Sequence, residues 1–226
     1  MGTSYNPPIV TDGLVFCVDA ANQRSYPKSG TTWSDLVGNY SGGFVNMDAN
    51  NFDESNGGNL SFDGSNEFIG FGNILSGPTA LSIFCSAKIY SVADCALISK
   101  GIGSVSNREY SLQVIGSNIA AVVADESAQD IDWFYGNSTL VSNKWYHLAM
   151  TWDGSELKMY VDSVYDGGGA TSVNSGDIEF RNDPLVIGRD NNAYGNCIIS
   201  NASIYNRALT GDEVRQNYEA TVGRFT

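Results

Sequence analysis

The stretch NKWYHLAMTWDGSELKMYVDS, residues 143–163, decides the fold class of this chain. Its first half places an apolar side chain at every second position, at Tyr146, Leu148, Met150 and Trp152. The triplet Asp-Gly-Ser then supplies turn residues, and the alternation resumes at Leu157, Met159 and Val161. Alternation with period two is the pattern of a strand with one buried face. The stretch therefore predicts an antiparallel hairpin that covers a hydrophobic core.

Strand patterns of the same kind extend along the chain on both sides of this hairpin. They occur at residues 13–20, 59–72, 80–90, 95–101, 109–116, 119–125, 130–136, 183–190 and 195–206. Within the second of these ranges Asp-Gly-Ser-Asn forms a turn between two strands, with Phe62, Phe68 and Phe71 at the buried positions. Twenty-five glycines and 12% aromatic residues suit many short strands joined by tight turns. The chain is therefore predicted to be all-β.

One segment near the end of the chain has helical periodicity instead. In TGDEVRQNYEA, residues 210–220, Thr210 can cap a first turn while Glu213 reaches back to the cap, as in a capping box. Val214 and Tyr218 then form a narrow apolar stripe. A helix of about ten residues is unstable alone in water. We therefore expect a short helix here, docked on a sheet as a structural closure.

The length of the chain and its lack of linkers indicate a single domain. A chain of 226 residues can bury one sizeable core, and it contains no Pro-rich or Ser-rich linker and no internal repeat. Residues 1–12, with Pro7 and Pro8, show no core-facing pattern and are expected to form an extended N-terminal arm. Residues 13–226 are expected to form the domain.

The charge balance excludes several classes of partner. Twelve basic against twenty-five acidic residues give a net charge of −13, which repels a phosphate backbone and an anionic membrane, so we expect no nucleic-acid binding. Nowhere do eighteen apolar residues run together, so no membrane insertion is expected. The first residues carry no basic segment followed by an apolar one, so we expect no signal peptide.

The residue types that carry most enzyme chemistry are sparse. The single histidine, His147, lies in an alternating strand with no identifiable nucleophile near it, so we expect a strand-face residue and not a general base. The cysteines lack a CxxC pair and are expected to be small buried hydrophobes, not zinc ligands: Cys17, Cys85, Cys95 and Cys197. A Cys85–Cys95 bridge across a hairpin is the less favoured alternative.

The order of these motifs resembles that of the concanavalin A-like, laminin-G-type jelly-roll family. The stretches that carry the resemblance are WYHLAMTWDG, LKMYVDS, PLVIGRD and IYNRALTGDEV, and Ser163 departs from the usual glycine. Two earlier stretches, GLVFCVDAANQRSYPKSGTTWSDLVGN and GGNLSFDGSNEFI, are similar to a version of the domain in structural proteins of tailed phages, particularly marine and cyanobacterial ones. The resemblance covers residues 13–222 and implies a two-sheet antiparallel jelly-roll sandwich.

The resemblance also directs attention to three kinds of site. Glycosidases of related folds carry Glu-x-Asp-x-x-Glu on one strand face, whereas here Asp130 and Asp132 have no following glutamate, so we expect no catalytic residues and no enzyme activity. No cofactor is required. Some relatives bind Ca²⁺ at the rim of the sandwich, and the candidate ligands are Asp190, Asn191, Asn192 and Asp125, with Glu109 and Asp130 as further partners. A solvated acidic turn is the alternative.

A glycan site would need an aromatic platform beside amide and carboxylate groups. Trp133, Tyr135 and Tyr194 are the candidates, with burial in the core as the alternative.

Two functions remain open at this point. The first is a non-enzymatic structural or decoration protein on the surface of a phage particle, assembled in the host cytoplasm. It would contact capsid or tail proteins through its N-terminal arm or a sheet face, and it could form a homo-oligomer. The second is a carbohydrate-binding adhesin or lectin on a tail fibre or cell surface, which would recognise host or environmental glycans. Calcium dependence would favour the second.

Overall fold

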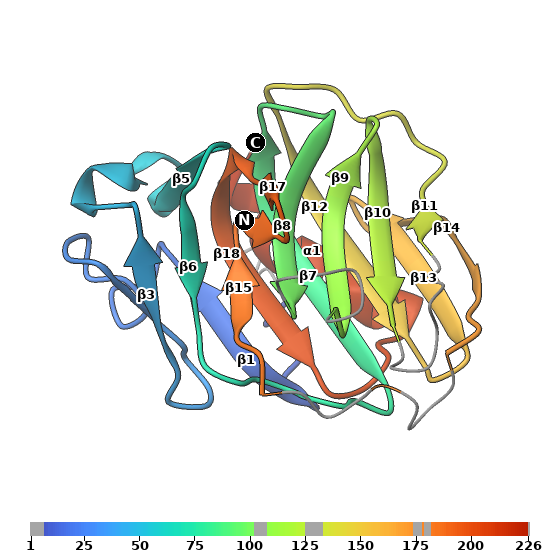
Figure 1. The fold of residues 1–226 in the computed structure, drawn as a ribbon. Helices are drawn as coiled ribbons and strands as arrows, with labels where there is room; N and C mark the ends of the chain where they lie inside the picture. Colours follow the sequence, from blue (N-terminus) through green and yellow to red (C-terminus); the bar gives the residue numbers. More distant parts are fainter. Residues whose placement is uncertain (1–6, 102–107, 125–132, 174–177, 179–181, 226) are drawn as a thin grey trace, which may run out of the picture.

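A computed structural model describes residues 7–101, 108–124, 133–173, 178 and 182–225. Within these residues the chain forms two eight-stranded antiparallel sheets, packed face to face, and one α-helix on the outer side of one of them (Figure 1). This arrangement confirms the all-β sandwich with a short C-terminal helix.

We call the sheet that carries the helix sheet A. Its strands, in spatial order, are β14 (Val164–Ala170), β13 (Glu156–Val161), β12 (Lys144–Trp152), β7 (Leu81–Ile89), β18 (Asn196–Tyr205), β5 (Asn59–Asp63) and β4 (Phe52–Asp53), and β1 (Leu14–Asp19) pairs with β18. The predicted hairpin of residues 143–163 is β12–β13, in which Leu148 pairs with Val161 and Trp152 with Leu157. The hairpin prediction is therefore confirmed.

Sheet B lies against the other face of sheet A. Its strands, in spatial order, are β11 (Phe134–Tyr135), β10 (Asn118–Val123), β9 (Tyr110–Ile115), β8 (Asp94–Lys100), β15 (Leu185–Ile187), β6 (Phe68–Gly70), β3 (Ser41–Val45) and β2 (Thr32–Ser34). A small hairpin follows β15 and consists of β16 (Arg189–Asp190) and β17 (Ala193–Tyr194). The short 3₁₀ turns are η1 (Ala49–Asn51), η2 (Ser55–Gly57) and η4 (Val222–Arg224).

The core lies between the two sheets and is continuous. Side chains of sheet A such as Met150 and Trp152 belong to the same buried cluster as Leu112 and Ile119 of sheet B. All four cysteines are buried and unbridged, as expected. Cys85 lies in sheet A and Cys95 in sheet B, so they are not cross-strand neighbours of one hairpin.

The turn after Phe62 differs from the expectation. Its two flanking strands, β5 and β6, belong to different sheets, so Asp63–Glu67 is a corner that carries the chain across the sandwich. Asp63 and Glu67 close this corner: the Asp63 carboxylate accepts from the Ser65 N–H at 2.8 Å, and the Asp63 N–H donates to Glu67 at 2.8 Å. Phe62 is buried, but Phe68 is half-buried and packs outward on the guanidinium of Arg189.

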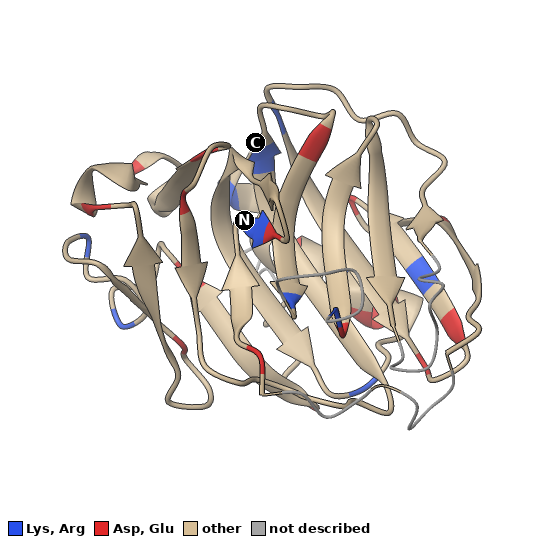
Figure 2. Cartoon of the chain, viewed as in Figure 1, with Lys and Arg blue, Asp and Glu red and all other residues tan. Residues whose placement is uncertain are grey.

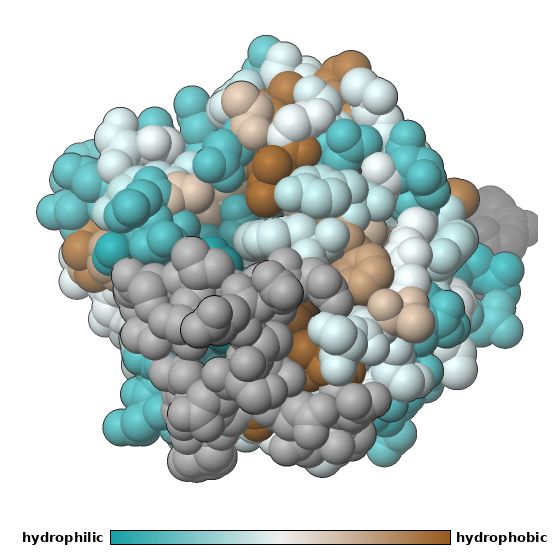
Figure 3. Space-filling view, turned by 45° about the vertical axis from the view of Figure 1, so that its right-hand side comes forward, coloured by the Kyte–Doolittle hydropathy of each residue, from teal (hydrophilic) through white to brown (hydrophobic). Residues whose placement is uncertain are grey.

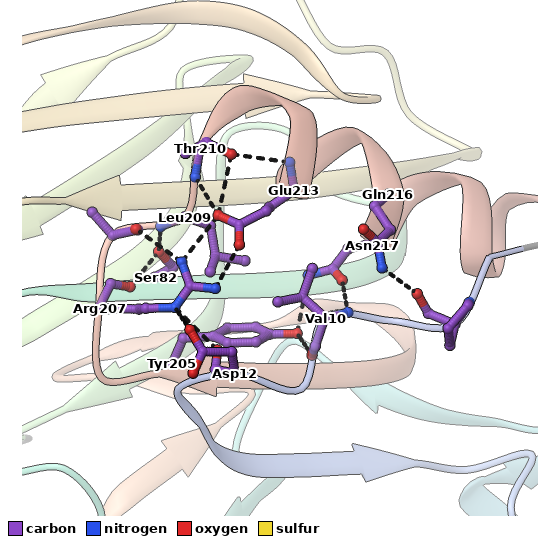
Figure 4. Close-up of polar contacts among 12 residues, drawn as sticks. Val10, Asp12, Ser82, Tyr205, Arg207, Leu209, Thr210, Glu213, Gln216 and Asn217 are labelled. Carbon is purple, nitrogen blue, oxygen red and sulfur yellow. Dashed lines mark hydrogen bonds and ion pairs between the residues drawn. The ribbon is translucent and has the colours of Figure 1, made fainter.

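The helix α1 (Gly211–Thr221) begins with the capping box that the sequence suggests. The Glu213 N–H donates to Thr210 Oγ1 at 3.3 Å, and the Thr210 N–H donates to Glu213 Oε2 at 2.9 Å (Figure 4). Arg207 also binds this carboxylate, at 2.6 Å, and its hydrogen bond is the main reason that the pKa of Glu213 falls to about 2. No helix in the described part of the chain is long and apolar enough to cross a membrane.

The described part of the N-terminal arm, from Pro7 to Asp12, is packed against α1. Val10 is buried; its N–H donates to Asn217 Oδ1 at 2.8 Å, and its carbonyl accepts from the Tyr205 hydroxyl at 2.9 Å (Figure 4). The Asn217 amide in turn donates to Tyr205 at 3.0 Å. The expectation that the arm lacks a core-facing residue is therefore wrong for Val10, because α1 supplies a small second core for it.

Candidate functional site

A hollow of about 340 Å³ lies on the outer face of sheet B, beside the β16–β17 hairpin. Along β9 the side chains of Leu112 and Val114 belong to the core, so Gln113 and Ile115 point the other way, into the hollow. Asp94 of β8, Arg108, two aromatic side chains and the hairpin complete the lining. Because successive side chains of a strand point to opposite faces, sheet B has polar side chains on its outer face here and apolar ones on its inner face.

A glycine places the hairpin over this face. Gly188 follows β15 with a φ of +87°, and a Cβ there would lie 2.5 Å from the Phe62 ring, so only glycine fits. Its N–H donates to the Leu97 carbonyl at 2.9 Å, which ties the start of the hairpin to β8. Asp190 then lies over the centre of the sheet, with its side chain toward β9.

A buried ion pair forms one wall of the hollow. Arg108 Nε lies 3.1 Å from both carboxylate oxygens of Asp190, and Nη2 lies 2.6 Å from Oδ1. The two side chains are 8% and 0% exposed. Gln113 also donates its amide to Asp190. The Asp190 carboxylate, which Gln113 also binds, therefore holds the Arg108 side chain in one orientation.

Asp94 is the second carboxylate of the hollow, and it is exposed. Partial burial raises its pKa above the ordinary value, and the negative charge of Asp190 raises it further. Figure 2 shows that other acidic residues are spread over strand ends and turns of both sheets. Asp94 and Asp190 therefore form a local pair of acidic side chains, whereas the other acidic residues are dispersed.

Two of the three predicted aromatic residues meet in the hollow. Trp133 faces the guanidinium of Arg108 at 5.0 Å, and Tyr135 on β11 is 50% exposed. Tyr194 does not line the hollow, because its ring packs on Arg189 at 5.4 Å, on the side of the hairpin that faces Phe68. Trp133 and Tyr135 therefore share one hollow and Tyr194 lies outside it, while the role of these residues in glycan binding stays a prediction.

The predicted calcium ligands are only partly brought together. Asp190, Asn191 and Asn192 all line the hollow, whereas Asp125 and Asp130 lie outside the described residues. The Asp190 carboxylate is already neutralised by Arg108. No group of three or more His, Cys, Asp or Glu side chains in the described ranges could hold a metal ion. These donors do not fit Ca²⁺ by themselves, and the set that includes Asp125 stays a prediction.

Glu109, a further candidate for that set, is used elsewhere. It is 1% exposed and lies 3.6 Å from the ammonium of Lys100, and it also accepts from the Ser76 hydroxyl at 2.9 Å and the Gly77 N–H at 3.0 Å. Its carboxylate is therefore a structural tie between β9 and the loop before β7.

Comparison with known families matches residues 63–215 to the family described as the concanavalin A-like lectin/glucanase superfamily. The match covers more than half of the chain. This protein is a concanavalin A-like domain of that superfamily. No curated protein matches the sequence.

Solved structures with the same fold show how broadly it is used. The Trypanosoma rangeli sialidase in complex with the inhibitor DANA superimposes with a TM-score of 0.65 at 15% identity, over 99% of this domain and 36% of the sialidase chain. The botulinum neurotoxin serotype D binding domain gives 0.67 at 18% identity, over 93% of this domain and 51% of the toxin chain. The domain thus spans about a third to a half of these proteins, and at such identities the likeness concerns the fold.

A second cavity, of about 30 Å³, lies between α1 and sheet A of this concanavalin A-like domain. His147 of β12, Ser86 of β7 and Asn201 of β18 line it side by side, with Ser86 Oγ 2.9 Å from His147 Nδ1 and 3.0 Å from Asn201 Oδ1. Burial, and then the charge of Arg224, lowers the pKa of His147 to about 4. A triad would need a carboxylate on the other ring nitrogen, but Nε2 of His147 is buried with no hydrogen-bond partner among the described residues, so the neutral His147 has no support as a catalytic base.

Sequence reasoning missed the residue that organises the hollow, Arg108. It lies 82 positions before its partner Asp190, at the start of β9, and nothing local marks the pairing.

Proposed function

We propose that this domain binds carbohydrate, and that the hollow beside Arg108 and Asp190 is its sugar site. One observation carries the proposal: the hollow brings Trp133 and the exposed Tyr135 together with several hydrogen-bonding side chains, of which Arg108 is held in place by Asp190. Sugar rings present apolar C–H faces and polar hydroxyl edges, so they need both kinds of surface at once. A volume of about 340 Å³ is at the lower end of the range of small-molecule sites.

The polar side chains of the hollow suit hydroxyl groups. Asp94 offers carboxylate oxygens that accept, Asn191 and Asn192 offer amides that donate and accept, and Arg108 offers N–H donors. The buried pair fixes Arg108 before any ligand arrives, so little conformational entropy is lost on binding. The described surface in Figure 3 mixes hydrophilic and neutral residues with small separate hydrophobic patches, which suits a polar ligand.

The related folds give the proposal general support. One of the similar structures is the sialidase in complex with sialic acid, and another is the receptor-binding domain of the botulinum neurotoxin C/D mosaic serotype. Both solved chains are much longer than this domain, and what they bind is a property of those proteins. The proposal for this domain rests on its own hollow.

The proposed activity is binding without hydrolysis. A glycosidase needs two carboxylates available to the scissile bond, one as acid and one as base or nucleophile. Of the two carboxylates that the described residues place in the hollow, Asp190 is 0% exposed and is held by Arg108 and Gln113, which leaves Asp94. We therefore propose a lectin-type module.

The phage-surface location, with capsid or tail proteins as partners, remains a prediction of the sequence resemblance, and so does a homo-oligomer. Docking by the arm would have to leave Val10 in place, since Val10 already bonds to Asn217 and Tyr205 within the domain. Mass spectrometry of purified particles tests the location: a stoichiometric signal supports it, and absence from particles rejects it.

A glycan array tests sugar binding directly. The domain is applied with calcium and with a chelator, alongside the Trp133→Ala variant and the matched control Tyr165→Ala, whose exposed ring packs on Tyr160 of sheet A. We expect saturable binding that Trp133→Ala weakens at least tenfold, about 1.4 kcal/mol, and that Tyr165→Ala leaves unchanged. Silence on the array under both conditions, or equal loss in both variants, would contradict the proposal.

A further inference from the structure

We infer that the sugar site selects uncharged sugars and rejects acidic ones, because the one cation that the described residues place in it is already neutralised inside the protein. The inference rests on the proposed function and adds the class of ligand to it. Acidic sugars carry a carboxylate, which proteins often bind through the edge of an arginine guanidinium. Whether Arg108 has a free edge therefore decides whether the site can bind an acidic sugar.

The lining of the hollow has more negative than positive charge. Among the described residues that line it, Asp94 and Asp190 oppose one guanidinium, that of Arg108, and the others are uncharged. Arg189 adjoins the hairpin, but its guanidinium lies between the rings of Phe68 and Tyr194, 5.1 and 5.4 Å away, and does not line the hollow. An anionic ligand would therefore enter a site with a net charge of −1 (one positive and two negative side chains).

The geometry of the pair leaves little of Arg108 for a second carboxylate. The edge formed by Nε and Nη2 is occupied by both oxygens of Asp190. The indole of Trp133 lies against the guanidinium at 5.0 Å. A ligand carboxylate that took this edge would displace Asp190, whose side chain is 0% exposed, and would leave a buried charge without its partner. Such an exchange is strongly unfavourable.

An uncharged sugar meets none of these obstacles. Among the described residues no acceptor engages Nη1 of Arg108, so this group can donate to a hydroxyl oxygen while the pair stays intact. The Asp94 carboxylate accepts from neighbouring hydroxyl groups.

The test compares glycans that differ only in a carboxylate. Immobilised oligosaccharides ending in glucose or galactose are paired with those ending in the corresponding uronic acid, at fixed ionic strength, and the ratio of the two dissociation constants is measured. We expect the wild-type domain to bind the neutral member at least tenfold more tightly.

Three variants separate the local pair from the overall charge. Asp190→Asn releases the edge of Arg108 and is expected to shift the ratio at least tenfold toward the uronic acid. Asp94→Asn, at an exposed position where folding is not at risk, is expected to shift it about threefold in the same direction. Glu156→Gln removes one negative charge from the β13 surface, where Glu156 is 42% exposed beside Lys158, and should leave the ratio unchanged.

The outcomes distinguish this inference from the proposed function. Tighter binding of uronic acids by the wild-type domain, with loss of binding in Trp133→Ala, would overturn the inference and keep the sugar site. An equal shift in Glu156→Gln and Asp94→Asn would also overturn it, since the effect would then come from net charge. If the domain binds neither glycan series, both the proposed function and the inference are wrong.

Discussion

The imidazole of His147 is kept neutral by what surrounds it. Ser86 and Thr221 approach Nδ1 at 2.9 and 3.4 Å, the rings of Tyr218 and Phe225 pack on its faces, and Arg224 adds a repelling positive charge. Asp162 lies nearby but binds the backbone N–H of His147, at 2.9 Å. Protonation of His147 would therefore bury a positive charge with little negative charge nearby to compensate it.

This arrangement predicts a loss of stability in mild acid. The unfolded chain protonates His147 near its ordinary pKa of 6.5, and the folded chain only near 4, so the free energy of unfolding falls as the pH drops between these values. The loss should amount to about 2 kcal/mol by pH 4.5. Urea unfolding at pH 7 and 4.5 measures it, with His147→Gln as the reference for all other titrating groups. An equal drop in wild type and variant would show that His147 is not responsible.

At the residue scale, the sequence located individual side chains better than their partners. Trp133, Tyr135 and Asp190 were predicted because their types suit a ligand; each lines the hollow, and their role in binding stays a prediction. The Arg108–Asp190 pair was invisible because the two residues meet only after β9 and the hairpin fold together. For this reason Asp190 looked like a metal ligand, although its charge is satisfied within the protein.

At the scale of elements, local pattern predicted strands well and their sheet membership less well. Strict alternation in β12 and β13 specifies both the hairpin and its buried face. The Asp63–Glu67 turn has the same residue types as a hairpin turn, yet it joins strands of different sheets. What separates the two cases is the burial of Phe62 against the far sheet, and no local sequence feature reports that.

The contact between the arm and α1 can be tested with two neighbouring amides. Asn217 is buried and bonds to Val10 and Tyr205, whereas Gln216 bonds to the Pro8 carbonyl at 2.8 Å at the surface. We expect Asn217→Ala to lower the free energy of unfolding by about 2 kcal/mol, because it leaves buried groups unsatisfied. Gln216→Ala should cost less than about 0.5 kcal/mol. Similar values for the two in denaturant titrations would contradict this account.

At the scale of the whole molecule, one continuous core should make the sandwich unfold as a unit. The same buried cluster contains residues of both sheets, including Trp33 of sheet B and Trp152 of sheet A, and both indoles are 0% exposed. We therefore expect tryptophan fluorescence and far-ultraviolet circular dichroism to give coincident thermal transitions. Two separated transitions would mean that the sheets are independent units.

The arm and the helix also determine how the domain responds to a pulling force. β1 and β18 are antiparallel neighbours, with Leu14 opposite Tyr205, so the segment before β1 and the segment after β18 leave this ladder at the same end. Tension applied between the arm and the segment that follows β18 would first load the bonds of Val10 to Asn217 and Tyr205, and then open the β1–β18 ladder one residue pair at a time. A ligand held on the outer face of sheet B would stay attached until that ladder had opened, because sheet B bears none of the load.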